Sequence, residues 1–368
     1  MIGPDILADL RTRLAHKIAG RPAIPPCDPL SISPWIAMSL LQKAIRRGHT
    51  PLALQAAATL LIDSPDRLWR RCGGIAFEDM GIADLDTLGL VTAALGGKRV
   101  RQTLGGEWAV GSFIVTAMAE ARKCRSADDL LMGVELHPDL AEARHKQAEL
   151  SIHQLRRIVL SQATLPERAL ALWFVLGTDR RPSPRLATRR GEPAFAFDLL
   201  DELGCPMTMV EIAREGFRRT REMLSPLVGL LMAGGAPTNP AVTDDDLGHE
   251  AFIGALPCWA LDTYTREGRR ALSRFAAGES RTAKWVRDRI PEGRHTAFLG
   301  DLLFQVEGGL MRRRLRWALG DSLRRQNEVE CRGVSPSEAS EILALLSSDI
   351  PQLNEVRAEV MEDTRHAR

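Results

Sequence analysis

The densest group of side chains that could carry out chemistry lies between residues 244 and 272. His249, Asp262 and Arg266 lie there among apolar residues. A histidine beside an aspartate can act as a general base with its orienting partner, so one hypothesis is an enzyme centred on His249, Asp262 and Arg266. The stretch does not complete a zinc-protease motif, because Ile253 stands where H-E-x-x-H requires the second histidine. The alternative is a buried polar network that fixes a turn of the chain.

The cysteine spacing argues against a metal site. The chain has 6 cysteines that lie tens of residues apart without a C-x-x-C pair, whereas a zinc site needs closely spaced ligands. A disulfide scaffold is smaller and denser in cysteine. We expect reduced, mostly packed thiols, and neither a metal nor another cofactor. The cysteines are Cys27, Cys72, Cys124, Cys205, Cys258 and Cys331.

Arginine dominates residues 265–326, where 15 lysines and arginines face 7 acidic residues. Basic helices of this kind bind nucleic-acid phosphates through charge and counterion release, and Trp285 and Trp317 lie among them. A basic loop at residues 177–193 could follow a DNA backbone as a mobile arm. The alternative is neutralisation within the fold by the acidic residues that follow. No zinc-finger spacing is found, so DNA binding is expected to be independent of base sequence. The predicted phosphate contacts are Arg312, Arg313, Arg314, Arg316, Arg269, Arg270, Arg189 and Arg190.

The elements that position these residues are predicted to be helices. Ile36, Leu40 and Ala44 form one apolar stripe, with Pro34 near its start and Gly48 past its end. No alternating run is long enough to predict a sheet, and aromatic residues, which strands favour, make up only 5% of the chain. The predicted fold class is all-α. Helices are also expected within the amphipathic residues 1–20 and at 207–232, 247–277, 281–289 and 296–325, with a terminal pair from 335. Trp35, Trp69, Trp108, Trp173 and Trp259 are expected to be core anchors.

The localisation is predicted from what the sequence lacks. No stretch approaches about 18 uninterrupted apolar residues, the length that a membrane-spanning helix requires. The N-terminal residues lack the apolar core of a signal peptide. We therefore expect a cytoplasmic protein without a membrane partner.

Two adjacent glycines precede an acidic pair in the same predicted helix. A glycine within a helix costs about 1 kcal/mol relative to alanine, so Gly73 and Gly74 are expected to allow another helix to approach closely. Glu78 and Asp79 are expected to cap the next helix or to pair with basic residues, rather than to act as a catalytic dyad. The expected basic partners are Arg70 and Arg71.

These residues belong to an ordered set of matches across residues 35–92 that fades by about residue 135. A Lys-x-x-Arg pattern in the first helix is followed by an (A/S)-x-E-D-(I/V/M)-G-x-A-D signature. The region resembles the helical collar that follows the ATPase core in MgsA/RarA-type AAA+ proteins, which are clamp-loader relatives that act at stalled replication forks. Gln42 departs from the pattern, since a histidine is common there. The matching positions are Lys43, Arg46, Arg70, Arg71, Glu78, Asp79, Gly81 and Asp84.

The resemblance implies a non-catalytic layer of helices that oligomerises subunits. No G-x-x-x-x-G-K-[ST] loop occurs in the sequence to cradle the phosphates of ATP. We therefore expect a collar-like protein without the ATPase core, which forms homo-oligomers and has an AAA+ or other motor protein as a partner. The predicted function is that of an adaptor in DNA replication, repair or mobile-element DNA maintenance that binds DNA, a motor partner, or both. A pure protein-interaction scaffold and the enzyme described above are the alternatives.

The length of 368 residues allows more than one domain. Residues 1–34 are expected to form an N-terminal helix and a proline-rich linker. Residues 35–162 are expected to form a clamp-loader-collar-like helical bundle. Residues 163–368 are expected to form a second helical domain that carries the arginine-rich helices.

Overall fold

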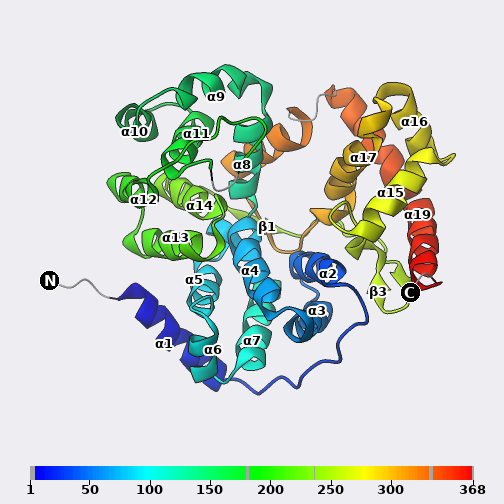
Figure 1. The fold of residues 1–368 in the computed structure, drawn as a ribbon, viewed down its shortest axis with the longest axis horizontal. Helices are drawn as coiled ribbons and strands as arrows, with labels where there is room; N and C mark the ends of the chain where they lie inside the picture. The colour runs from blue at the N-terminus through cyan, green and yellow to red at the C-terminus, as the bar shows by residue number, and fades with distance from the viewer. Residues whose placement is uncertain (1–4, 180–181, 236, 331–334, 367–368) are drawn as a thin grey trace. The chain divides into compact units, whose positions relative to one another are not determined.

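A computed structural model describes residues 5–179, 182–235, 237–330 and 335–366, and they form an all-α protein, as predicted (Figure 1). Two short antiparallel strand pairs accompany the helices in these ranges. Within the same ranges, no helix has both the length and the apolar character that crossing a membrane requires.

The chain divides into two compact units, each built from three separate segments. The first contains Met1–Ile24, Trp69–Thr243 and Arg313–Gly333, and the second contains Pro25–Leu68, Asp244–Arg312 and Val334–Arg368. One boundary falls within the proline-rich linker. The structure has no border at the expected residue 162, because that residue lies between α10 (Ile152–Leu160) and α11 (Leu165–Leu176), which pack against each other inside the first unit. Contacts between segments distant in the sequence therefore set the units, whereas the expected domains were continuous.

The first unit consists mainly of short helices, and many of them pack against the helix that precedes or follows them in sequence. Its helices are α1 (Ile6–Ala19), residues 69–75 of α4 (Pro65–Ile75), α5 (Leu85–Ala94), α6 (Lys98–Thr103), α7 (Glu107–Glu120), α8 (Ser126–Leu136), α9 (Ala141–Ala148), α10 (Ile152–Leu160), α11 (Leu165–Leu176), α12 (Pro193–Glu202), α13 (Met207–Thr220), α14 (Leu224–Ala233) and α18 (Ala318–Arg325). Shorter helical turns are η1 (Ala76–Met80), η2 (Gly81–Ala83), η3 (Pro138–Leu140) and η7 (Gln326–Glu330). Strand β1 (Ala241–Thr243) pairs with β4 (Arg314–Arg316).

The second unit joins an N-terminal helical pair to helices from the C-terminal part of the chain. Its helices are α2 (Pro34–Arg46), α3 (Thr50–Asp63), α15 (Arg266–Ala277), α16 (Arg281–Arg289), α17 (His295–Leu303) and α19 (Pro336–His366), with the turns η4 (Cys258–Ala260), η5 (Glu292–Arg294) and η6 (Phe304–Gly308). Strand β2 (Phe252–Ile253) pairs with β3 (Leu256–Pro257). Apolar side chains of α15, α16, α17 and α19 form its core. The ribbons of these helices run from yellow to red in Figure 1.

The helix expected at residues 247–277 begins only at Arg266. Before it, the chain forms the β2–β3 pair and η4. Gly248 and Gly254 adopt positive φ angles of 62° and 64°, which a helix does not allow. Pro257 in β3 has no backbone N–H to donate. The glycines and the proline therefore outweigh the helical spacing of the apolar residues.

The helix expected at residues 296–325 is also interrupted. Helix α17 ends at Leu303, the π-helical turn η6 follows, and Arg314–Arg316 forms strand β4. Arg313 has a φ of 55°, a left-handed conformation that ends any regular helix. By contrast, the expected terminal pair is a single helix, α19, which continues through Pro351.

One of the two adjacent glycines of α4 makes a close helix contact. A Cβ added to Gly73 would lie 2.7 Å from Thr220 Cγ2 of α13. A Cβ added to Gly74 would have no such neighbour within 4 Å. The expected role in close packing therefore holds for Gly73 and not for Gly74.

Alanine substitutions at these two positions separate packing from helix propensity. We expect Gly73→Ala to lower the free energy of unfolding by about 1–3 kcal/mol, because the added methyl group overpacks the contact with Thr220. Gly74→Ala should raise it by up to about 1 kcal/mol, because alanine favours the helix and the site is open. Urea denaturation followed by circular dichroism measures both changes, and equal effects of the two substitutions would contradict the packing assignment.

Candidate functional site

Three basic residues at the end of α2 point into the second unit. Ser33 caps the helix, since its hydroxyl accepts a hydrogen bond from the backbone N of Ile36 at 3.3 Å. Lys43, Arg46 and Arg47 are only 3%, 4% and 3% exposed. Buried cations are stable only when they are paired and hydrogen-bonded, so their partners define the site.

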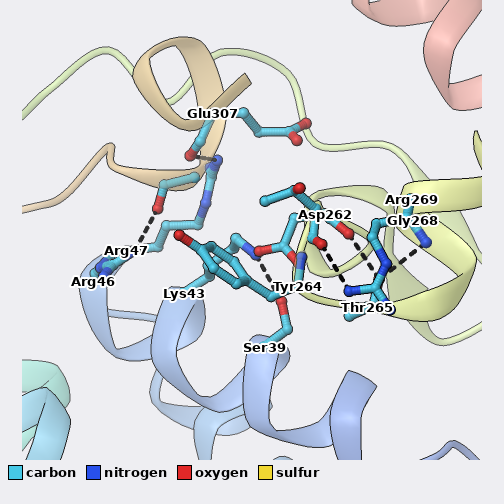
Figure 2. Close-up of polar contacts among 12 residues, drawn as sticks. Ser39, Lys43, Arg46, Arg47, Asp262, Tyr264, Thr265, Gly268, Arg269 and Glu307 are labelled. Carbon is cyan, nitrogen blue, oxygen red and sulfur yellow. Dashed lines mark hydrogen bonds and ion pairs between the residues drawn. The ribbon is translucent and has the colours of Figure 1, made fainter. Parts of the chain in front are cut away.

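Lys43 forms a buried ion pair with Asp262 (Figure 2). Its Nζ also donates a hydrogen bond to Ser39 Oγ at 2.6 Å, one helical turn earlier. Burial lowers the pKa of Lys43, and the charge and hydrogen bond of Asp262 oppose that shift. The ion pair joins α2 to the turn before α15, across 219 residues of sequence.

Asp262 also organises the first turn of α15 (Figure 2). Its Oδ1 accepts a hydrogen bond from the backbone N of Tyr264 at 2.9 Å, and its backbone oxygen accepts one from Thr265 Oγ1 at 3.0 Å. Thr265 is the N-cap and accepts from the backbone N of Gly268 at 3.0 Å. Position 268 requires glycine, because a Cβ there would lie 2.0 Å from the Asp262 backbone oxygen. One carboxylate thus fixes both the turn and its attachment to α2.

The two arginines beside Lys43 bind the end of η6. Arg46 Nη1 donates to the backbone oxygen of Gly308 at 2.8 Å, and Arg47 Nη2 donates to that of Glu307 at 3.1 Å (Figure 2). The Glu307 carboxylate accepts hydrogen bonds of 3.1 and 2.7 Å from Arg357 of α19. Oxygen atoms in the interior therefore accept hydrogen bonds from all three guanidinium groups. The three arginines thus stabilise the packing of the second unit.

The described structure does not join the histidine and aspartate of the enzyme hypothesis. His249 is exposed, and Arg266 is exposed on α15. Asp262 pairs with Lys43 instead, and no hydrogen bond links it to His249 within the described ranges. A buried ammonium gains more from a carboxylate than an exposed imidazole does. The polar-network alternative therefore describes Asp262 better than the role of an orienting acid.

The five cysteines in the described ranges are free thiols, and four of them are buried. Burial raises the pKa of Cys72 to about 12 and that of Cys205 to about 11. These two thiols are therefore protonated at neutral pH and are weak nucleophiles. Among the described residues, no group of three or more histidine, cysteine or acidic side chains could hold a metal ion. Cys331 lies outside the described residues.

The acidic pair of the collar-like signature binds an arginine that the sequence reasoning did not name. Arg125 Nη1 donates to Glu78 Oε1 at 2.7 Å and to Asp79 Oδ1 at 2.8 Å, and its other nitrogen pairs with Asp128. Burial acts to lower the pKa of Arg125, but the neighbouring carboxylates outweigh it and raise this pKa. The cluster holds η1 against the start of α8 in the first unit. Of the expected basic partners, Arg70 is exposed and Arg71 half-buried.

Two further residues of that signature serve the local backbone. Gly81 has a φ of 47°, and a Cβ there would lie 2.8 Å from the backbone oxygen of Cys124. Asp84 caps α5 by accepting a hydrogen bond from the backbone N of Thr87 at 3.0 Å. The residue that caps the helix after the acidic pair is therefore Asp84, rather than Glu78 or Asp79.

The arginines predicted to contact phosphates divide into buried, engaged and exposed residues. Arg314 is only 7% exposed in β4, and Arg316 Nε donates to Asp321 Oδ1 at 2.7 Å. Arg189 donates to two backbone carbonyls. Strand pairing buries Arg314, so it is not available to a phosphate. The exposed members are Arg190, Arg269, Arg270, Arg312 and Arg313. Of these, Arg313 also donates to the backbone oxygen of Glu120, and Arg269 to that of Thr263.

Helix α15 has a wholly basic outer face. Its exposed charged residues are all arginines, and its one acidic residue, Glu267, is buried. Leu272 and Phe275 on the opposite face belong to the core of the unit. This amphipathic pattern places the basic side chains together on one side of the helix. The exposed residues are Arg266, Arg269, Arg270 and Arg274.

A surface hollow of about 520 Å³ lies at the start of α15. Trp35 and Tyr264 line it and are 58% and 69% exposed. The sequence reasoning placed Trp35 in the core, and this was wrong because it lies off the apolar stripe of α2. Trp285, which lies among the basic helices, is buried and stacks on Phe298. The other lining residues are Ser33, Arg266, Glu267 and Arg269.

Comparison of the chain with protein-family models, curated proteins and solved structures finds no match. The resemblance to AAA+ collars therefore rests on the sequence motif alone and stays a prediction. The interpretation of the site depends on its own geometry.

Removal of Asp262 tests the structural role of the ion pair. Asp262→Ala leaves a buried ammonium without its partner, so we expect the free energy of unfolding to fall by about 3–5 kcal/mol at neutral pH. Adding Lys43→Met removes the buried charge and should restore much of that loss. The control is Glu142→Ala, which breaks the exposed pair with Lys146 and should leave the urea midpoint unchanged.

The loss in Asp262→Ala should also depend on pH. Because the folded-state pKa of Lys43 is lowered, the unfolded chain binds more protons between the two pKa values, and stability rises with pH in that window. Without Asp262 the pKa falls further and the window widens. The loss should therefore shrink between about pH 7 and pH 10. A loss that is constant across this range would contradict the buried-charge explanation.

Proposed function

We propose that the protein is a non-catalytic adaptor that binds nucleic acid through the second unit, in DNA replication, repair or mobile-element DNA maintenance. The observation that carries the proposal is the outer face of α15, on which every exposed charged side chain is an arginine. Arginine is suited to phosphate because its planar guanidinium presents several donors in a fixed geometry.

The basic face is only partly neutralised by the rest of the unit. Asp363 of α19 lies 2.6 Å from an Arg274 nitrogen and 3.9 Å from one of Arg270. All three side chains are well exposed, and exposed ion pairs contribute little to stability. Exchange of such a carboxylate for a phosphate therefore meets a small energetic barrier. Arg266 and Arg269 have no ion-pair partner among the described residues.

Helix α16 adds further exposed basic side chains that could contact phosphates. The exposed residues of α16 include Arg281, Lys284, Arg287 and Arg289, against one exposed acid, Asp288. The apolar sides of α15 and α16 share one core, so the two helices hold their charges on a common rigid support. Contacts of this kind recognise the backbone and not the base sequence.

The collar-like features, which fall in both units, support an assembly role for the protein. The matching residues Lys43, Arg46, Glu78 and Asp79 lie in internal ion pairs and hydrogen bonds, as expected for a scaffold rather than a catalyst. We therefore include homo-oligomerisation and a motor partner in the proposal.

Reversing two charges on α15 tests nucleic-acid binding. We expect Arg269→Glu with Arg270→Glu to weaken DNA binding at low salt by more than tenfold and to reduce the slope of log K against log[salt] by about 2, because each lost phosphate contact releases about one counterion fewer. The matched control is the adjacent pair on α10, Arg156→Glu with Arg157→Glu. Absence of binding at low salt, or equal losses in both variants, would contradict the proposal.

The mass of the protein in solution tests the assembly role. We expect light scattering after gel filtration to give a multiple of the 40.6 kDa chain mass, and a larger mass when DNA is added. A mass of 40.6 kDa at all concentrations would contradict homo-oligomerisation. The result is independent of the charge-reversal experiment.

A further inference from the structure

The hollow at the start of α15 combines two exposed aromatic rings with a basic rim. Trp35 lies in the first turn of α2, and Tyr264 lies in the turn before α15 (Figure 2). Exposed aromatic rings beside arginines are the features that bind single-stranded nucleic acids, because bases stack on the rings while the arginines contact phosphates. The volume of about 520 Å³ is in the range of small-ligand sites.

The Trp35 ring and the Tyr264 backbone are held in place before any ligand binds. The guanidinium of Arg67 lies 5.2 Å from the centre of the Trp35 ring, which is a cation–π contact. The backbone of Tyr264 is fixed by its hydrogen bond to Asp262 Oδ1. Because Asp262 is also paired with Lys43 of α2, the two helix starts that carry the rings are joined.

Glu267 gives the hollow a polar group that faces a ligand. It is only 7% exposed, and it lines this hollow and a second one beside Ile36 and Leu256. No hydrogen bond or ion pair of its carboxylate is found among the described residues. Water reaches both carboxylate oxygens, and the N-terminal end of the α15 dipole favours their negative charge. A ligand with N–H donors would replace that water at the carboxylate.

We propose that this hollow binds one unpaired guanine of a single-stranded nucleic acid. The base stacks against Trp35 and Tyr264, its N1–H and N2–H groups donate to the Glu267 carboxylate, and the flanking phosphates contact Arg266 and Arg269. Guanine fits better than thymine, whose single N3–H lies between two carbonyl oxygens that repel a carboxylate. The inference rests on the proposed function and assigns the strand type and base that the second unit recognises.

Fluorescence anisotropy with three labelled probes tests the inference. The probes are an oligothymidine, the same oligothymidine with one central guanine, and a duplex of equal length. We expect the guanine probe to bind most tightly among the single strands. Trp35→Ala and Tyr264→Ala should each weaken binding to the guanine probe about tenfold, the typical loss for one stacked base, and leave duplex binding unchanged. Trp35→Phe and Tyr264→Phe should retain most of the affinity.

Two further variants separate stacking and base recognition from a general loss of structure. Glu267→Gln should abolish the preference for guanine over thymine and retain binding to oligothymidine. Phe252→Ala removes another exposed aromatic ring of the same unit, 49% exposed and outside the hollow, and should leave all affinities unchanged. Thermal unfolding of each variant shows whether it is folded.

The outcomes distinguish this inference from the proposed function. Single-strand affinities that are unaffected by Trp35→Ala and Tyr264→Ala, with binding still lost on reversal of Arg269 and Arg270, would overturn the hollow as a base site and leave the proposed function standing. A guanine preference that persists in Glu267→Gln would overturn the role of the carboxylate. Absence of binding to all three probes at low salt would overturn both proposals.

Discussion

The buried ion pair between Lys43 and Asp262 is the interaction on which the arrangement of the second unit depends. It closes a long loop in the chain and fixes the first turn of α15 against α2. A buried pair of this kind contributes little net stability compared with apolar packing, but removal of one partner is severe. Its role is therefore positional. Through this pair, Trp35 and Tyr264 keep their places beside the same hollow.

The charges of the second unit fall into two classes with different roles. Arg46, Arg47 and Arg357 are buried and bind interior oxygens, so they are not available to a ligand. The arginines of α15 are exposed on one face. The formal net charge of the whole chain is only +2, and it conceals this local separation. Surface placement, rather than total charge, supports the proposal of nucleic-acid binding.

The sequence was sufficient where local signals agree. Helix α2 follows the apolar stripe through Ile36, Leu40 and Ala44, and its start at Ser33 and Pro34 obeys capping preferences. The all-α class followed from many such helices. The prediction of a helix across residues 247–265 was wrong, because the positive φ angles of Gly248 and Gly254 outweigh the helical spacing of the apolar residues.

The candidate site was harder to predict because its parts are distant in sequence. Asp262 was identified as a polar residue of interest, and Lys43 as part of a motif, but no spacing rule connects them. Trp35 was assigned to the core although its position off the α2 stripe indicated exposure. The basic face of α15 was predicted in part, since Arg269 and Arg270 were named. Arg314 was named as well, and its burial follows from a strand pairing with β1 that local spacing cannot reveal.

Hydrogen–deuterium exchange with and without a guanine-containing single strand tests the central claim most directly, because it locates the binding site without any substitution. The expected result is slower exchange in the first turn of α2 and at residues 262–270. Slower exchange confined to other segments, at a strand concentration that saturates binding, would contradict the assignment of nucleic-acid recognition to the start of α15.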